Sequence, residues 1–290
     1  MSARLKLRGA SRASTVLRVI HTFTPAHRAR RSGGTLQPVS VKRGIFVAPF
    51  DELVDPRVLA ELAQNAEARG WDGFFVWDHV AWSAPVRAVA DPWVALAAVA
   101  CATRTVRLGP LVTPLSRRRV QKLARETVTL DHLSGGRLTL GVGLGSVRNG
   151  ELEPFGEVVD ARERAVLLDR GLEQLSELWA GAFEPLPLQR PRIPIWVAAR
   201  WPNRRPLARA ARWDGLFPIE LPGPDELAVL AGELRLLRDE AAAPVELIAE
   251  LPPGGDAGAW ERAGATWLLT AFGPQPRLAE VREAIEAGPG

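Results

Sequence analysis

The segment FFVWDHVAW, residues 74–82, joins a run of large apolar side chains to two groups that can carry chemistry, Asp78 and His79. Histidine is the side chain whose unperturbed pKa, about 6.5, lies nearest neutrality, and it is the commonest general acid or base. The chain contains no tyrosine and only four histidines. The Asp78-His79 pair is therefore the first candidate for proton transfer.

A repeating pattern of strands and helices must position this pair. From Gly44 onward, short runs rich in β-branched and aromatic residues alternate with helical stretches, which is typical of parallel βα units. Eight units favour an α/β fold of the (β/α)₈ TIM-barrel type over a doubly wound open sheet, which usually has fewer strands. The predicted strands are 44–49, 73–78, 106–112, 137–142, 194–199, 215–219, 245–250 and 266–271, and the predicted helices are 55–69, 91–103, 118–133, 160–180, 203–212, 225–240, 256–264 and 276–287.

A Trp-Asp-Gly motif recurs in this pattern, beginning at Trp71 and at Trp213. Each copy lies between a helix end and the next strand, so both belong to the N-terminal end of the barrel. We expect the two motifs to serve packing and capping.

The barrel assigns the histidines to different places, because barrel enzymes carry their chemistry at the C-terminal ends of the strands. His79 follows the second strand and lies at that end. His132 lies in a helix-to-strand turn at the opposite end, where Gly135 is expected to end the helix in the left-handed conformation. His21 and His27 precede the barrel. We therefore predict that His79 is the catalytic acid or base; a structural histidine at a strand end is the alternative.

The side chains around His79 are expected to divide their roles. Adjacent strand residues point to opposite sides, so one of Asp78 and His79 should enter the pocket while the other braces the loop. Trp82 is expected to exclude water or to stack on a planar ring, with packing as the alternative. Trp77 is assigned to the core.

A glycine-rich loop follows the fourth predicted strand. Its sequence GVGLG resembles a dinucleotide-binding fingerprint, but Ser146 stands where the third glycine belongs. Gly143 and Gly145 present no side chain, so we expect them to let a flat ligand approach the backbone closely.

An arginine-rich loop, RWPNRRP, follows the fifth predicted strand. Asn203 is expected to cap a helix there, and Arg200 is expected to help that helix N-terminus bind a phosphate. A solvated run of charges is the alternative interpretation.

Charge separates an N-terminal segment from the barrel. Residues 1–43 hold ten Lys and Arg and no acid, whereas residues 44–290 hold the other 27 basic residues and all 33 acids, a net of 27 − 33 = −6. We predict a disordered basic extension over 1–43 and a barrel domain over 44–290. A transit peptide, or a natural start codon near Val41, is the alternative for the extension.

Composition argues against several other functions. The barrel carries no basic and aromatic stripe, which argues against nucleic acid, and no apolar run of about 18 residues, which argues against a membrane span. The single cysteine, Cys101, cannot form an internal disulfide, which fits the cytoplasm. No metal ligands are predicted, and a metal-dependent barrel hydrolase is the least favoured alternative because only one histidine stands at the active end.

Several segments resemble the bacterial-luciferase-like flavin-dependent oxidoreductases. They are FVWDHV, VRLGPLVTPL, LARETVTLDHLSGGRLTLGVGLG and QRPRIPIWVAARWPNRRPLARAARWDGLFP, and the similarity spans residues 44 to 288. The resemblance implies a (β/α)₈ barrel that binds reduced FMN or the deazaflavin coenzyme F-420 at its C-terminal mouth. It also implies a small organic substrate and, for a monooxygenase, a separate flavin reductase, and it leaves a homodimer open.

The resemblance also implies roles for individual residues. His79 matches a base near the reactive ring, and Trp82 is the nearest match to a neighbouring tryptophan. Leu111-Val112-Thr113 matches a bulge against the back of the ring, sometimes formed through a non-proline cis peptide. The expected cofactor-binding residues are Asp78, Val112, Thr113, Gly143, Gly145, Ala198, Ala199 and Arg200, and the expected substrate-pocket residues are Trp82 and Ser146.

The chain departs from these relatives at two places. Ser146 stands where deazaflavin-dependent sugar-phosphate dehydrogenases carry a glutamate, which argues against that substrate class. The stretch from Gly181 to Ile193 lacks a usual hairpin insertion, which predicts a more open pocket. A catalytically silent flavin-binding barrel is therefore the second hypothesis.

Overall fold

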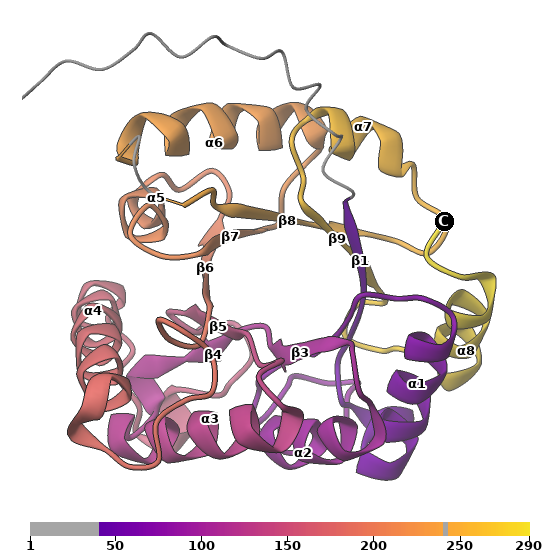
Figure 1. Cartoon of the computed structure of the whole chain (residues 1–290), viewed down its shortest axis with the longest axis horizontal. Coiled ribbons are helices and arrows are strands. Elements are labelled where there is room, and N and C mark those ends of the chain that lie inside the picture. Colours follow the sequence, from indigo (N-terminus) through magenta and orange to yellow (C-terminus); the bar gives the residue numbers. More distant parts are fainter. Residues whose placement is uncertain (1–40, 240–242) are drawn as a thin grey trace, which may run out of the picture. The chain divides into compact units, whose positions relative to one another are not determined.

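Nine parallel strands form a nearly closed barrel in the computed structural model, which describes residues 41–239 and 243–290 (Figure 1). The strands lie in the order β3-β2-β1-β9-β8-β7-β6-β5-β4. Their bounds are β1 Lys42–Val47, β2 Gly73–Val76, β3 Arg107–Pro110, β4 Thr113–Pro114, β5 Leu140–Gly143, β6 Ile195–Arg200, β7 Gly215–Ile219, β8 Glu246–Leu251 and β9 Trp267–Ala271.

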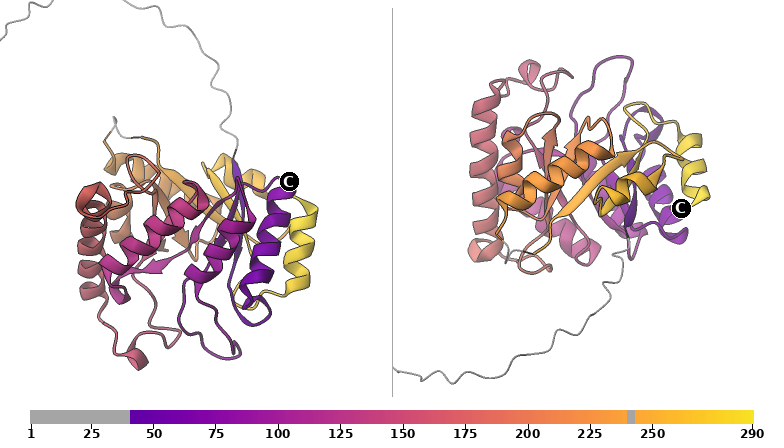
Figure 2. Two further views of the ribbon diagram at one scale, coloured as in Figure 1. Left: turned by 60° about the horizontal axis from the view of Figure 1, so that its bottom comes forward. Right: turned by 90° about the horizontal axis from the view of Figure 1, so that it is seen from above.

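Helices surround this barrel on the outside (Figure 2). Their bounds are α1 Pro56–Ala68, α2 Pro92–Ala102, α3 Val120–Ser134, α4 Ala161–Glu177, α5 Arg205–Ala210, α6 Pro224–Leu237, α7 Ala257–Arg262 and α8 Leu278–Ala287. Short 3-10 turns lie at Asp51–Leu53, Leu115–Arg117 and Glu153–Phe155, and a π turn at Leu178–Ala182 follows α4. The last helix returns to the first, where Arg282 of α8 pairs with Glu61 of α1 at 3.0 Å.

The eight predicted units are all present, and the predicted TIM barrel is confirmed. The third predicted strand is divided: β3 ends at Pro110, and β4 pairs instead with β5. Backbone hydrogen bonds close the barrel beside this division, because Leu108 N donates to Arg137 O at 3.1 Å and Thr139 N donates to Leu108 O at 2.9 Å. The predictions for residues 1–40 lie outside the described residues.

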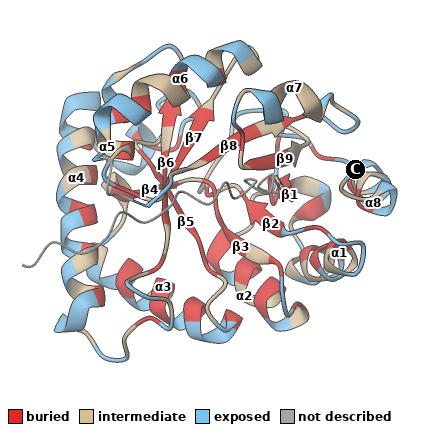
Figure 3. Ribbon diagram, turned by 45° about the horizontal axis from the view of Figure 1, so that its top comes forward, coloured by how far each residue is buried: buried red, intermediate tan, exposed pale blue. Residues whose placement is uncertain are grey.

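Alternation along the strands divides the core into a lumen and an outer layer. In β8, Ile248 faces the lumen with Phe46, Trp196 and Trp267, whereas Leu247 belongs to the layer under the helices. Figure 3 shows the buried residues gathered on the strands and on the inward faces of the helices. The barrel is thus a packed body, and ligand space is expected only above its strands.

The turns at the N-terminal end serve structure, as predicted. Gly135 ends α3 with φ 70°, and His132 Nε2 lies 2.7 Å from the carbonyl oxygen of Leu186. In the two Trp-Asp-Gly motifs, the aspartate accepts a hydrogen bond from the backbone of a strand. Asp72 accepts one from Arg43 N of β1, and Asp214 accepts one from Ile195 N of β6.

The short segment between α4 and β6 also lies at this end. Gln189 Nε2 donates to Leu138 O at 2.7 Å and to Asp131 of α3 at 2.8 Å. Because this segment is on the far side from the active end, the expectation that its shortness opens the pocket is wrong. Within the described residues, no helix is long and apolar enough to cross a membrane.

Candidate active site at the C-terminal mouth

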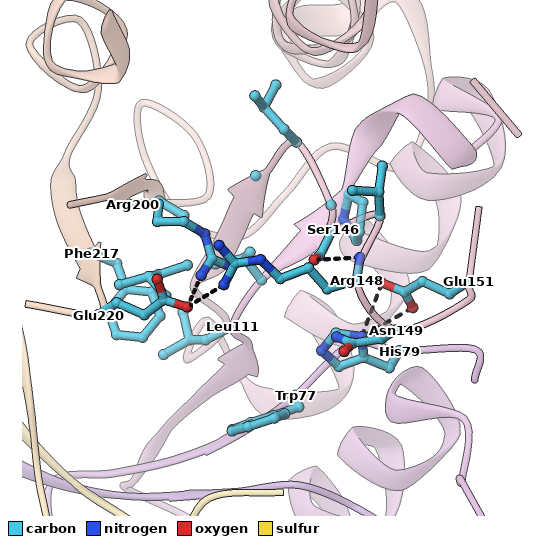
Figure 4. Close-up of a pocket in the computed structure, with 18 of the residues that line it drawn as sticks. Trp77, His79, Leu111, Ser146, Arg148, Asn149, Glu151, Arg200, Phe217 and Glu220 are labelled. Atoms are coloured by element: carbon cyan, nitrogen blue, oxygen red, sulfur yellow. Dashed lines mark hydrogen bonds and ion pairs between the residues drawn. The ribbon is translucent and has the colours of Figure 1, made fainter. Parts of the chain in front are cut away.

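A cavity of about 660 Å³ lies at the C-terminal ends of the strands (Figure 4). Its volume is in the range of pockets that hold cofactors and small molecules. Eight of the residues predicted from the sequence line it, namely His79, Trp82, Val112, Gly143, Gly145, Ser146, Ala198 and Arg200. Three do not, namely Asp78, Thr113 and Ala199.

Asp78 lies behind the cavity wall and binds other side chains instead. Its buried carboxylate accepts hydrogen bonds from Thr113 Oγ1 at 2.6 Å, Trp93 Nε1 at 3.2 Å and both Arg117 and Arg118, at 2.7 and 2.9 Å. Such a fully partnered buried carboxylate positions its neighbours and has no lone pair directed at the cavity. The direct cofactor contacts expected for Asp78 and Thr113 are therefore corrected to a bracing role.

His79 faces the cavity from the opposite side of the same strand end. Its Nδ1 lies 3.0 Å from both carboxylate oxygens of Glu151, which is fully buried and also accepts from Arg117 at 2.8 Å. Because the carboxylate bonded to Arg117 is an acceptor, Nδ1 carries a hydrogen, and in the neutral ring the lone pair lies on Nε2. Nε2 has no hydrogen-bond partner among the residues described.

The contact with Glu151 gives His79 what a general base needs. The carboxylate fixes the tautomer and the ring orientation, and it stabilises the positive charge that forms when Nε2 takes a proton. The side chain of His79 is 18 % exposed, which is enough to meet a ligand in the cavity. We expected one of Asp78 and His79 to enter the pocket and the other to brace the loop. His79 lines the cavity, and Asp78 does not.

Aromatic rings surround the imidazole. Trp82 stands edge-on to His79 with ring centroids 4.5 Å apart, and Trp77 lies 5.8 Å away. Trp77 was assigned to the core, but it lines the cavity and is only partly buried. Its buried Nε1 has no hydrogen-bond partner in the described part of the chain.

The bulge after β3 forms one wall. The Leu111–Val112 peptide is cis, as the resemblance implied, and the Val112 side chain lines the cavity. Gly143 is required beside it, because a Cβ there would lie 2.7 Å from Val112 Cγ2. Gly145 is required for a different reason, since its φ of 75° lies in the left-handed region.

Two arginines line the mouth, Arg148 in the loop after β5 and Arg200 at the end of β6. Arg148 and Arg200 both pair with Glu220, the former at 3.1 Å (Figure 4). Burial lowers the pKa of Arg200, and the nearby Arg148 lowers it further. A phosphate entering here would meet two guanidinium groups that share a single carboxylate, an arrangement that suits an anion.

The arginine-rich loop is only partly as predicted. Asn203 Oδ1 accepts from Arg205 N at 3.0 Å, but α5 begins at Arg205 with Arg204 at the N-cap position, so the prediction of Asn203 as the N-cap is wrong by one residue. Arg204 pairs with Glu233 at 2.7 Å and stacks on Trp201, which directs it away from the cavity. Ala199 is buried in the layer under the helices, so the expectation that it contacts the cofactor is wrong.

Sequence reasoning missed several residues of the site, including Arg148 of the mouth. Glu151, Arg117 and Arg118 form the network behind His79, and their signal was the basic run that follows β4 and the acid in the loop after β5. Glu250 of β8 lines the cavity, and burial raises its pKa to about 7. His79 is therefore not the only cavity group that can take part in proton transfer, and the acids of the alternating strand ELIAEL were the signal for Glu250.

The residues present fit a flat ring that carries a phosphate. One wall is apolar, with Leu111, Val112 and Phe217, and the backbone at Gly143 is bare. The mouth supplies the paired arginines. No group of three or more potential metal ligands occurs within the described ranges.

A (β/α)₈ barrel with a histidine-bearing mouth of this form defines a class of cofactor-binding barrel enzymes. The family model of the luciferase-like monooxygenases matches residues 20–288, and the chain belongs to that family. The match begins inside the basic N-terminal segment.

The named relatives include a flavin-dependent enzyme and an F-420-dependent enzyme. The chain is 30% identical over 179 residues to the oxygenase component of the flavin-dependent trigonelline monooxygenase of Acinetobacter baylyi, covering 55% of this chain and 46% of that protein. It is 34% identical over 174 residues to the F-420-dependent glucose-6-phosphate dehydrogenase of Beutenbergia cavernae, covering 53% and 50%. The chain thus spans about half the length of these relatives.

A solved structure supports the fold alone. The coenzyme F-420-dependent tetrahydromethanopterin reductase of Methanopyrus kandleri superposes with a TM-score of 0.65 at 16% identity, covering 85% of this chain and 96% of that one.

Proposed function

We propose that this protein is a flavin-dependent oxidoreductase that binds reduced FMN or coenzyme F-420 in the mouth cavity and acts on a small organic substrate. The observation that carries the proposal is His79, whose free Nε2 faces a cavity with one apolar wall and arginines at its rim. The family membership supports it, because members include both flavin monooxygenases and F-420-dependent dehydrogenases.

Two sets of residues would hold the cofactor. Val112 and Gly143 would pack against the ring, and Arg148 and Arg200 would bind its phosphate. When bound, the cofactor supplies either hydride transfer or, as reduced FMN, the activation of O₂.

His79 would move the proton in either reaction. Its Nε2 can accept a proton from a substrate hydroxyl or return one to an oxygen atom, while Glu151 stabilises the charged imidazolium. Arg117 pairs with Glu151 at 2.8 Å and holds its carboxylate in place. Trp77 and Trp82 would exclude water from this exchange.

The choice of cofactor determines the partner. An FMN-dependent monooxygenase would need reduced flavin from a separate reductase, as for a relative named as an oxygenase component. An F-420-dependent enzyme would need none. A cytoplasmic location and a homodimer remain predictions, as do the disordered extension over 1–43 and the barrel domain over 44–290.

One titration tests the proposal. The purified protein is titrated with FMN and with F-420, each oxidised and reduced, and the complexes are assayed for O₂ consumption and for oxidation of alcohols. Binding of one cofactor followed by turnover supports the proposal. Binding without turnover on any substrate would favour a silent flavin-binding barrel, and no binding of either cofactor would contradict both.

A further inference from the structure

Glu250 stands apart from the other acids of the cavity. It follows Ile248 on the lumen side of β8 and lines the cavity together with Phe46, Trp77 and Phe217. The structure shows no hydrogen bond or ion pair for the Glu250 carboxylate within residues 41–239 and 243–290, although the backbone of Glu250 pairs with Leu269 of β9. An acid held this way among apolar groups is a candidate for ligand binding.

The other carboxylates of the cavity are all neutralised. Glu151 pairs with Arg117 and His79, and Glu220 pairs with Arg148 and Arg200. Arg164, a further charged group of the lining, donates to the carbonyl oxygen of Val159 at 2.8 Å. Only Glu250 is left, among the described acids of the lining, without a positive group beside it.

The neighbouring aromatic rings, like the carboxylate of Glu250, favour a positively charged ligand. Phe46 lies 5.9 Å from Trp77 and 5.7 Å from Phe217, centroid to centroid, so the three rings form one continuous surface. Aromatic faces attract cations, above all quaternary ammonium groups. A carboxylate and an aromatic surface in one cavity therefore select for positive charge and against a neutral or anionic group.

We propose that Glu250 and the surface of Phe46, Trp77 and Phe217 bind a cationic nitrogen of the substrate, so that the enzyme acts on quaternary ammonium compounds or protonated amines. This inference rests on the proposed function, because it places the substrate in the cavity that the cofactor shares.

The acid–base behaviour of Glu250 agrees with this role. Burial raises the pKa of Glu250 to about 7, since no positive group among the described residues lies beside its carboxylate to offset the cost of ionisation. A bound cation would offset it, so cation binding should release a proton. Affinity should rise with pH until Glu250 is fully ionised.

Other groups face this site and must be separated from it. The neighbouring strands β7 and β9 carry no charged side chain, and Glu220, which follows β7, is already paired. Lys42 and Arg43 of β1 lie at the opposite end of that strand. His79 is the remaining group of the lining that must be separated from Glu250, and its Nδ1 is bound by Glu151 at 3.0 Å.

The test uses a matched pair of probes, choline and its neutral carbon isostere 3,3-dimethylbutan-1-ol. Binding to the full chain is measured by calorimetry at pH 6 and pH 8, for the wild type, Glu250→Gln, and the control Glu163→Gln, which removes an exposed acid of α4. With a pKa of about 7, the ionised fraction of Glu250 rises about tenfold over this interval, so choline should bind about tenfold tighter at pH 8.

The neutral alcohol should bind equally at both pH values. Glu250→Gln should weaken choline binding at pH 8 by about tenfold and remove most of its pH dependence. Glu163→Gln should behave as the wild type. The wild-type pH dependence needs no variant, so it tests the inference even if Glu250→Gln folds poorly.

Two results would overturn the inference: equal affinity for both probes at pH 8, or choline binding that is tighter at pH 6. The proposed function is judged separately by repeating the measurement on protein saturated with the cofactor that it binds. Cofactor binding without a preference for choline would contradict the cation site alone. A preference for choline in a protein that binds neither cofactor would contradict the proposed function alone.

Discussion

Residues of the same type have different partners at the two ends of the barrel. Glu246 and Glu250 lie four residues apart on β8, and both face the lumen. At the N-terminal end, Glu246 accepts hydrogen bonds from Arg107, Trp196 and Trp267 at 2.8 to 3.0 Å. At the C-terminal end, Glu250 has no such partner in the described structure.

Their acid–base properties follow from this difference. Although burial alone would raise the pKa of Glu246, the charge of Arg107 and the two indole hydrogen bonds lower it overall. The pKa of Glu250 is instead raised to about 7. The histidines repeat the contrast, since His132 Nε2 bonds a carbonyl oxygen and His79 Nε2 is left for a ligand. Polar groups whose charge or hydrogen bonds are satisfied by other side chains stabilise the barrel. Polar groups without such partners lie where a ligand can bind.

The largest expected effect is on catalysis. His79→Asn should lower kcat by a factor on the order of 10² to 10⁴, because it removes the positioned acid–base while leaving an uncharged side chain in the same place. Cofactor affinity should change little, which separates the loss of a proton carrier from the loss of the site. His132→Asn, at the other end, should keep full activity, and equal rates for both variants would remove the distinction between the ends.

The next effect is on stability at the N-terminal end. Glu246→Ala should lower the free energy of unfolding by about 3 to 5 kcal/mol, because it leaves the partly buried Arg107 without its anion. Urea unfolding monitored by circular dichroism measures this loss. A loss below about 1 kcal/mol would mean that the cluster does not support the barrel.

Glu250→Gln should instead raise the free energy of unfolding. The pKa of Glu250 is raised from 4.5 to about 7 in the folded protein, so its contribution to stability is present below pH 4.5 and is lost as pH rises through 7. The variant should therefore match the wild type near pH 4 and exceed it by up to about 3 kcal/mol at pH 8. Unfolding curves across this range check it, and a variant less stable than the wild type at pH 8 would contradict the assignment.

The smallest effect concerns the arginines of the mouth. Arg200→Ala should weaken FMN binding about tenfold and leave riboflavin, which lacks the phosphate, unchanged. Arg204→Ala is the matched control, since Arg204 is directed toward Glu233. Fluorescence titration with both flavins measures the difference; equal losses for FMN and riboflavin would mean that Arg200 does not bind the phosphate.

The fold could be predicted because it depends on local, periodic signals. Alternating apolar runs, helix lengths and the repeated Trp-Asp-Gly motif define eight units without knowledge of any contact. The division of the third strand could not be predicted from that pattern alone, because VRLGPLVTPL is apolar throughout and the break depends on a backbone conformation.

The site was only partly predictable, because its key contacts join distant parts of the chain. His79 meets Glu151 across 72 residues, and no periodicity indicates such a pair. Asp78 was expected to contact the cofactor because the resemblance implied it, but Arg117 and Arg118 bind its carboxylate. Glu250 could not be recognised from its strand. Alternation predicts which side of the sheet a residue faces, but it does not predict whether a positive group lies beside the carboxylate.

The indole groups offer the most direct test that the cofactor binds at the C-terminal end. Trp77 lines the cavity and Trp213 lies at the N-terminal end, and each has a buried Nε1 without a partner in the described structure. In a ¹⁵N-indole spectrum, adding the cofactor that binds should shift the resonances of Trp77 and Trp82 and leave that of Trp213 in place. A shift of Trp213 alone, or no shift with saturating FMN and F-420, would contradict a flavin site at the mouth of this barrel.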